Sequence, residues 1–168
     1  MERHAGMTLI ELLTVLALVA ILAGLAVPAL EGLLLDARRA AAMDGLLRAA
    51  WFARTEALRR GAPVLLCASA DGLRCASDPA AWSFGWRVTP DREPELTLRR
   101  GTGAVDPRAR LLANRSTFRF EPHDRRSTNG TLAWCDRRGA DAARAVVIAP
   151  TGRPRLERGA GALACEVP

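Results

Sequence analysis

The hydrophobic pattern changes character twice along the chain. Residues 12–35 are almost continuously apolar, interrupted only by two glycines, Thr14, Pro28 and Glu31. A run of this length can cross a bilayer, which takes about 20 apolar residues. Beyond it, apolar residues recur at helical spacing, and after Pro63 short segments bounded by turn residues take over. The pattern predicts a membrane-crossing segment, an amphipathic helix and a β-rich region, in that order.

One long helix is expected over residues 8–60. The apolar residues of its second half form a stripe at helical spacing: Met43, Leu46, Leu47, Ala50, Ala53 and Ala57. Pro28 should kink the helix, because proline removes a backbone donor and its ring clashes with the preceding turn. Gly61 and Pro63 should end it. We expect the first half to lie in lipid and the second half to pack its stripe on a globular domain.

The region after Pro63 predicts short strands. The candidates are residues 64–67, 85–89, 95–99, 116–120, 130–134 and 144–149. Phe118 and Phe120 should share one face, because side chains alternate along a strand. Asn129-Gly130 suits a tight turn feeding the next strand. The stretches between the strands, residues 151–156 (TGRPRL) among them, are rich in Gly, Pro, Asp and Arg and are expected to be loops.

The charge is unevenly distributed. The formal net charge is +6, and every basic residue other than histidine is an arginine. Residues 31–98 hold nine arginines and nine acids, whereas residues 99–158 hold fourteen arginines and six acids. The basic excess therefore lies in the C-terminal part. Such an imbalance concerns anionic partners, not the fold.

The four cysteines are Cys67, Cys75, Cys135 and Cys165. Their spacing does not suit zinc, and no histidine lies close to a pair. An even number in a chain with a membrane segment suggests disulfides formed in an oxidising compartment. Of the three pairings, we favour one that closes a short loop between Cys67 and Cys75 and pins the C-terminal tail through Cys135 and Cys165. The alternatives are the two other pairings, or one pair that is buried and reduced.

The N-terminal block of residues 6–13, GMTLIELL, resembles the cleavage signal of type IV pilins and type II secretion pseudopilins. The resemblance implies that residues 1–6 are a leader, that a prepilin peptidase cleaves after Gly6, and that Met7 becomes the N-methylated terminus, where phenylalanine is usual. It also implies that Glu11 pairs with the terminal amine of a neighbouring subunit during assembly. A carboxylate inside an apolar run is costly in lipid, which supports a functional role for Glu11.

The remainder of the chain resembles the GspH/FimT group of minor pilins and pseudopilins, most closely the FimT-like minor pilins that bind DNA. The resemblance is carried by Asp71-Gly72 between two cysteines and by residues 82–86, 117–120, 129–132, 135–136 and 146–155. It implies an α+β, pilin-like fold, in which the long N-terminal helix packs on an antiparallel sheet or sandwich. It also implies a low-abundance subunit near a filament tip.

Within that group, some members bind DNA during natural transformation through a Gly-Arg-x-Arg motif, which here is Gly152-Arg153-Pro154-Arg155. Arginine offers a planar fork of donors suited to phosphate, glycine lets the backbone approach closely, and proline limits the ordering entropy lost on binding. Arg158 is included in the predicted site. Four further arginines could widen it: Arg125, Arg126, Arg137 and Arg138. The alternative is a set of solvated loop charges.

The leading hypothesis is therefore a minor type IV pilin that binds double-stranded DNA non-specifically for uptake. The alternative is a type II secretion minor pseudopilin, or a pilus-priming subunit, with protein partners only. We expect no enzyme activity, cofactor or metal, because His4 and His123 stand alone and no catalytic constellation is visible. Trp82, Trp86 and Trp134 should be core residues or subunit contacts, with base stacking as the alternative.

The expected organisation follows from these patterns. Residues 1–6 are the leader, 7–30 the transmembrane and filament-core half of the helix, 31–60 its amphipathic half, and 61–168 the globular domain. The expected location is the bacterial inner membrane, with a single pass, followed by a periplasmic or extracellular filament. The expected partners are other pilins or pseudopilins, the prepilin peptidase, the inner membrane and DNA.

Overall fold

The computed structural model describes residues 8–104, 106, 108–123 and 126–165. Its elements follow one another as α1 (Leu9–Arg60), β1 (Val64–Ala68), η1 (Pro79–Ser83), β2 (Gly85–Pro90), β3 (Arg99–Thr102), β4 (Ala109–Ala113), β5 (Thr117–Phe120), β6 (Gly130–Asp136), η2 (Ala140–Ala142), β7 (Arg144–Ile148) and β8 (Pro154–Arg158). The chain divides into two compact units, residues 1–37 and 38–168.

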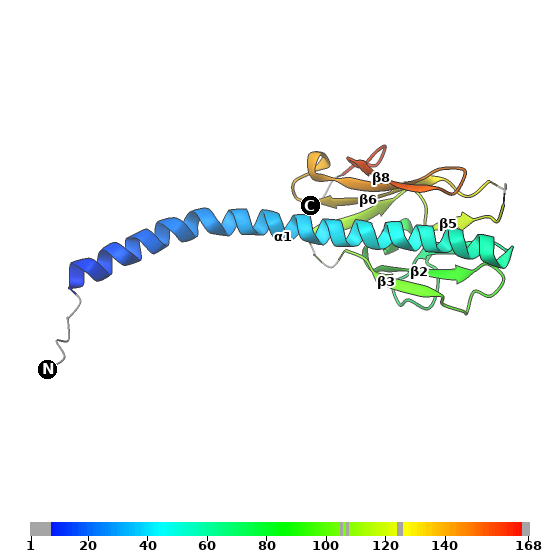
Figure 1. Cartoon of the computed structure of the whole chain (residues 1–168), viewed down its shortest axis with the longest axis horizontal. Coiled ribbons are helices and arrows are strands. Elements are labelled where there is room, and N and C mark those ends of the chain that lie inside the picture. The colour runs from blue at the N-terminus through cyan, green and yellow to red at the C-terminus, as the bar shows by residue number, and fades with distance from the viewer. Residues whose placement is uncertain (1–7, 105, 107, 124–125, 166–168) are drawn as a thin grey trace. The chain divides into compact units, whose positions relative to one another are not determined.

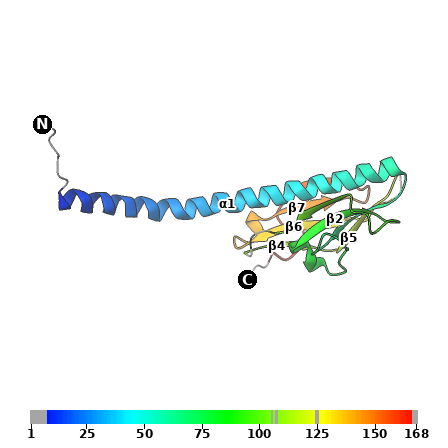
Figure 2. The ribbon, with the colours of Figure 1, turned by 90° about the horizontal axis from the view of Figure 1, so that it is seen from below.

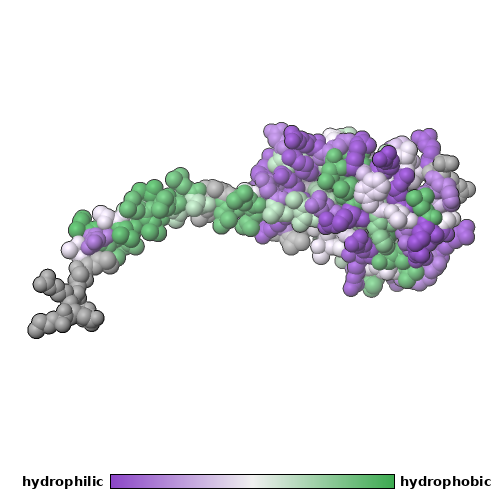
Figure 3. All heavy atoms as spheres, in the orientation of Figure 1, coloured by the Kyte–Doolittle hydropathy of each residue, from purple (hydrophilic) through white to green (hydrophobic). Residues whose placement is uncertain are grey.

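The first unit holds the N-terminal part of α1. The helix begins after Thr8, whose hydroxyl accepts a hydrogen bond from the backbone N–H of Glu11 at 3.3 Å, in the manner of an N-cap. By length and composition the helix is apolar enough to cross a membrane. Most of its large apolar side chains between Leu9 and Leu34 are exposed, and Figure 3 shows stretches of hydrophobic surface along this part of the helix. The helix continues through Pro28, and the kink expected there stays a prediction.

The second unit is built on the predicted stripe of α1. Met43, Leu46, Ala50, Ala53 and Ala57 are buried in the main core. The small alanine side chains let the helix backbone lie close to the strands beneath it, which Figures 1 and 2 show from two directions. The prediction that this half of the helix packs its apolar stripe on the globular domain is therefore confirmed.

Two antiparallel sheets form the rest of the second unit. Their strand orders are β3-β2-β1-β5 and β4-β6-β7-β8. Phe118 and Phe120 both point into the core, as the alternation predicted. Trp82, Trp86 and Trp134 are buried, which confirms that they are core residues.

Three strand predictions need correction. Residues 95–98 are not a strand, and β3 begins only at Arg99. The edge strands β4 and β8 lie where loops were expected. Their pairing is set by the partner strands β6 and β7 and not by their own residues. Such pairing leaves no local period in the sequence.

Asn129-Gly130 is not a hairpin turn, because β5 and β6 belong to different sheets. Gly130 begins β6, and a Cβ there would lie 2.4 Å from Asn114 Oδ1 and 2.8 Å from Phe118 Cε1. The glycine is needed for close packing.

The structure contains disulfides between Cys67 and Cys75 and between Cys135 and Cys165, in agreement with the favoured pairing. The second bond ties the C-terminal segment to β6, beside a small apolar cluster that includes Ala133, Ala145 and Ala160. The C-terminal residues described are thus fixed against the second sheet.

Candidate functional site

The Gly-Arg-x-Arg motif forms the turn and first residues of the β7–β8 hairpin. Gly152 has φ +74°, in the left-handed region that favours glycine, and its N–H donates to Ala149 O at 2.8 Å. Ala149 N–H in turn donates to Arg153 O at 3.1 Å, which closes the hairpin. A turn followed by a left-handed glycine suits a short hairpin connection.

Two neighbouring segments hold this turn in place. Arg54 of α1 donates a hydrogen bond from Nη1 to Thr151 O, and Ser127 N–H donates to Pro150 O at 2.9 Å. A Cβ at Gly152 would come within 2.7 Å of Ser127 Oγ and 2.9 Å of Arg54 Nη1. The turn is therefore held between α1 and the segment before β6. Binding a ligand there would cost little conformational entropy, because the turn is already ordered.

The stretch after the turn is an edge strand, which corrects the expectation of a loop. In the β7–β8 register Arg155 pairs with Val147 and Leu156 with Val146. Gly159 N–H donates to Ala143 O at 2.9 Å, and antiparallel bonds recur at every second residue. Pro154, Leu156 and Arg158 therefore direct their backbone groups to the open edge. Pro154 lacks an N–H where β7 needs none, so the sheet tolerates it.

The predicted DNA-binding residues do not share one face. Arg153 is exposed, and within the described part of the chain its side chain has no hydrogen bond or ion pair. Arg155 is also exposed, but its Nε donates to Glu157 Oε1 at 2.6 Å. Alternation places Arg158 on the other face of β8 from Arg155, where it lines a pocket with Arg39 and Arg144.

The arginines expected to widen the patch have different roles. Arg126 is exposed and adjoins Ser127, so its backbone lies next to the turn. Arg125 lies outside the described residues. Arg54, which sequence reasoning did not include, contacts the turn directly. Its signal was weak, because it lies among the polar positions of an amphipathic helix.

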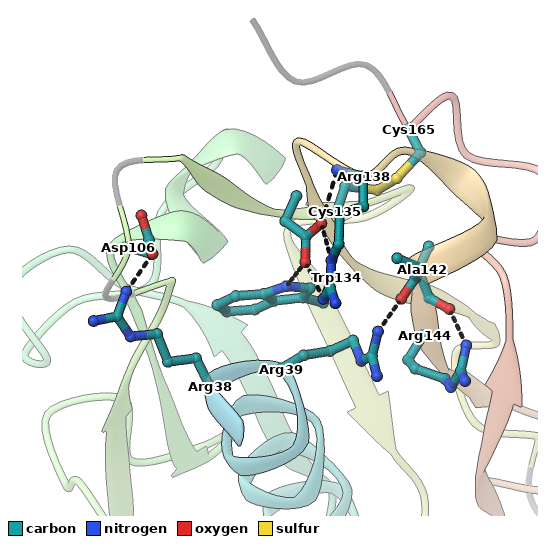
Figure 4. Close-up of polar contacts among 11 residues, drawn as sticks. Arg38, Arg39, Asp106, Trp134, Cys135, Arg138, Ala142, Arg144 and Cys165 are labelled. Atoms are coloured by element: carbon teal, nitrogen blue, oxygen red, sulfur yellow. Dashed lines mark hydrogen bonds and ion pairs between the residues drawn. A yellow bond between two sulfur atoms is a disulfide. The ribbon is translucent and has the colours of Figure 1, made fainter. Parts of the chain in front are cut away.

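Arg138 forms an ion pair within the fold. It donates to the buried carboxylate of Asp136 from Nε at 3.0 Å and from Nη2 at 2.8 Å (Figure 4). These hydrogen bonds, opposed by burial, lower the pKa of Asp136 below its usual value. Trp134 Nε1 donates to the same carboxylate at 3.4 Å. Arg138 therefore stabilises a buried charge and is unsuited to phosphate binding.

At the N-terminus, Gly6 and Met7 lie outside the described residues, so cleavage and methylation there stay predictions. Glu11 is exposed in the first turn of α1, and its role in assembly also stays a prediction. Among the residues that the structure describes, no group of three or more His, Cys, Asp or Glu side chains could hold a metal ion.

Comparison with known proteins agrees with this architecture. Residues 42–152 match the family of type II transport protein GspH, and residues 1–27 match the prokaryotic N-terminal methylation motif. A crystal structure of the type IV minor pilin FimU from Pseudomonas aeruginosa PAO1 is similar with a TM-score of 0.58 and 20% identity, covering 76% of this chain and 95% of that chain. A second FimU crystal form gives 0.56 and 20%, covering 75% and 98%.

At this level of identity, the FimU structures show that the fold is shared. Curated protein sequences give no match. The family match spans more than half of the chain and includes α1 from residue 42 onward, strands β1 to β7 and the turn as far as Gly152. The methylation motif and the apolar helix together indicate membrane anchoring before assembly into a filament. The chain therefore belongs to the GspH family and is a minor pilin or pseudopilin of the type IV pilin superfamily, a structural subunit of a type IV pilus or a type II secretion system.

Proposed function

We propose that this chain is a minor type IV pilin that binds duplex DNA non-specifically at the Gly152–Arg155 turn for uptake in natural transformation. The observation that carries the proposal is the exposure of the Arg153 side chain. This guanidinium is exposed on a turn that Arg54 and Ser127 hold in place, and within the described part of the chain it has no ionic partner. A charge presented in this way is available to an anion.

The chemistry of the turn suits a phosphate backbone. Arg153 can offer two parallel N–H donors to phosphate, which is the geometry that guanidinium groups favour. Arg126 adds a second exposed positive charge beside the turn, and the Arg54 guanidinium remains charged while it bonds Thr151 O. Contacts of this kind give affinity without reading the base sequence.

In the maturation and assembly that we propose, this turn lies outside the cytoplasm. A prepilin peptidase would cleave after Gly6 and methylate Met7, while the apolar part of α1 holds the chain in the bacterial inner membrane by a single pass. The subunit would then enter a periplasmic or extracellular filament, and its two disulfides fit an oxidising compartment. Glu11 would pair with the terminal amine of a neighbouring pilin.

A second candidate function is that of a type II secretion minor pseudopilin, or a pilus-priming subunit, with protein partners only. The ion pair between Arg155 and Glu157 favours it, because it engages one of the two motif arginines. The description of the matching family as a type II transport protein also favours it.

The test is DNA binding by the full chain in a non-ionic detergent. Fluorescence anisotropy with a labelled duplex of about 30 base pairs, at several salt concentrations, should give a Kd on the order of micromolar that rises steeply with salt. The double variant Arg153→Ala/Arg155→Ala should lose most of this binding, because two phosphate contacts are removed.

The matched control is Arg92→Ala/Arg110→Ala, which removes two exposed charges from other parts of the second unit and should bind almost as the parent does. If the Arg153/Arg155 variant binds like the parent, the assigned site is wrong. If the parent chain does not bind DNA, the function with protein partners only is favoured.

A further inference from the structure

Each sheet has one edge that another segment covers and one that the described residues leave open. Leu111 of β4 exchanges two hydrogen bonds with the Ser83 hydroxyl, at 3.2 and 3.3 Å. Arg119 O of β5 accepts a hydrogen bond from Thr128 N–H at 2.8 Å. No such bond reaches the outer edges of β3 and β8 in the described part of the chain. An open edge presents unpaired backbone donors and acceptors, to which a further strand can add.

β3 is the better of the two open edges for strand addition. Gly103 N–H donates to Phe84 O at 3.1 Å, and antiparallel bonds recur at every second residue. Arg100 and Thr102 therefore direct their backbone N–H and C=O groups outward, and both residues can donate and accept. On β8, by contrast, the outward-facing Pro154 has no N–H to donate.

An apolar pocket lies beside β3, and α1 supplies part of its wall. It has a volume of about 350 Å³, and Trp86 and Trp134 line it. Thr102 borders it on β3. Arg38 also lines it, but the Arg38 guanidinium forms an ion pair with Asp106 (Figure 4). The pocket therefore suits an apolar side chain.

A second pocket borders β3 on the side of the Cys67–Cys75 loop. It has a volume of about 400 Å³, and Thr102 lines it as well. Arg100 lines it with an exposed side chain that makes no hydrogen bond or ion pair within the described residues. Phe84, which is 70% exposed, adds an aromatic surface. Asp71 also lines the pocket, but its carboxylate accepts hydrogen bonds from backbone N–H groups of its own loop.

We propose that β3 is a strand-addition site for an extended segment of a partner protein that carries an acidic residue between apolar ones. Backbone hydrogen bonds to Arg100 and Thr102 supply the affinity. Successive side chains of an added strand point to opposite faces, so an apolar side chain enters the pocket beside Trp86 and the acidic side chain meets Arg100. β3 and the Gly152–Arg155 turn belong to different sheets, so the site is independent of DNA binding.

A second copy of this chain is a poor occupant of the β3 edge. β3 and β8 carry two arginines each. Pairing β3 with either strand of another copy would bring these charges together, and like charges directly opposite one another destabilise a sheet. The same arginines attract an acidic segment, which favours a partner of different sequence.

The test uses the full chain in a non-ionic detergent and a fluorescein-labelled peptide, Ser-Val-Thr-Val-Glu-Val-Thr-Ser. In antiparallel register with β3, its glutamate lies opposite Arg100, its second valine opposite Gly101 and its first threonine opposite Thr102. Fluorescence anisotropy should show saturable binding. Absence of saturable binding overturns the site.

N-methylated forms of the peptide distinguish strand addition from contact through side chains alone. The N–H groups of the first threonine and the glutamate point to β3, whereas those of the second and third valines point away. Methylation of the first pair should weaken binding roughly tenfold because two hydrogen bonds are lost, and methylation of the second pair should change it by less than about threefold. Equal losses would contradict strand addition. The protein is the same in both measurements, so a folding defect cannot cause the difference.

Charge reversal locates the bound peptide. Arg100→Glu should weaken binding roughly fivefold, and a peptide with lysine in place of glutamate should bind this variant better than it binds the parent. Arg110→Glu is the matched control, because Arg110 lies on β4, whose edge Ser83 covers. Equal effects of the two variants would overturn the site at β3. A dimer of the parent chain in analytical ultracentrifugation that Arg100→Glu dissociates would overturn the choice of partner in favour of a second copy.

Discussion

Two structural requirements select glycine at position 152: a positive φ and the absence of room for a side chain. Its φ of +74° is strained for any residue with a side chain, and its Cα lies against Ser127 and Arg54. The first requirement is local to the hairpin, whereas the second depends on α1 and on the segment before β6. The residue therefore connects the geometry of the turn to the packing of the second unit.

Gly152→Ala should lower the free energy of unfolding by about 1–3 kcal/mol, from backbone strain together with steric overlap. Gly139→Ala is the matched control, because Gly139 has φ +77° but a Cβ there meets nothing within 4 Å. Urea denaturation should show the smaller loss for the control. Equal losses in the two variants would mean that the contacts with Ser127 and Arg54 contribute nothing.

At the scale of the element, the end of α1 is held by a buried carboxylate. Glu56 accepts hydrogen bonds from Arg59 at 2.6 and 2.9 Å and from Arg60 at 2.7 Å. These bonds, the one from Arg59 foremost, lower the pKa of Glu56 to about 2, although burial acts in the opposite direction. The charged carboxylate therefore stabilises the folded state.

The sign of the pH effect follows from this depressed pKa. Stability contributed by Glu56 is fully present above its unfolded pKa of about 4.5 and is lost as the pH falls towards about 2. Glu56→Gln should be less stable than the parent near neutral pH, by on the order of 2 kcal/mol, and this difference should shrink across that window. Urea denaturation at several pH values measures it. Asp44→Asn, an exposed change on the same helix, is the control, and a pH-independent difference for Glu56→Gln would contradict the assignment.

The edge strands show where prediction at this scale reaches its limit. Residues 154–158 contain proline, two arginines and a glutamate, a composition that local propensity assigns to a loop. The strand forms because β7 supplies the pairing partners, and because Pro154 falls where no donor is needed. Neither condition can be read from the segment itself.

At the scale of the whole molecule, two disulfides constrain loops of different length. Cys135 and Cys165 are 30 residues apart, and Cys67 and Cys75 are 8 residues apart. The entropy that a cross-link removes from the unfolded chain grows with the logarithm of the loop length.

Replacing both cysteines of a pair by serine should therefore cost more for Cys135/Cys165 than for Cys67/Cys75, by about 1 kcal/mol out of about 3. Denaturation of the two double variants, compared with the parent, measures the difference. The reverse order would show that contacts in the folded state, not loop length, decide the contribution of each bond.

Sequence alone determined the features that depend on neighbours along the chain. The apolar run is continuous along the chain. The stripe from Met43 to Ala57 and the alternation of Phe118 and Phe120 are periodic, and each period specifies which face is buried. The N-terminal motif and the Gly-Arg-x-Arg motif are likewise contiguous. The helix, most of the strands, the core tryptophans and the family resemblance could therefore be predicted.

Tertiary structure decided which arginines are available to a ligand. The fourteen arginines of residues 99–158 look alike in the sequence, yet Arg138 bonds a buried carboxylate, Arg155 pairs with Glu157 and Arg153 points to solvent. Arg54 contacts the hairpin turn, and Arg39 contacts η2 just before the hairpin, from a helix about 100 residues earlier. Charge acts through space and is cancelled by whichever group the fold brings near it, so the position of a charge along the chain cannot reveal its partners.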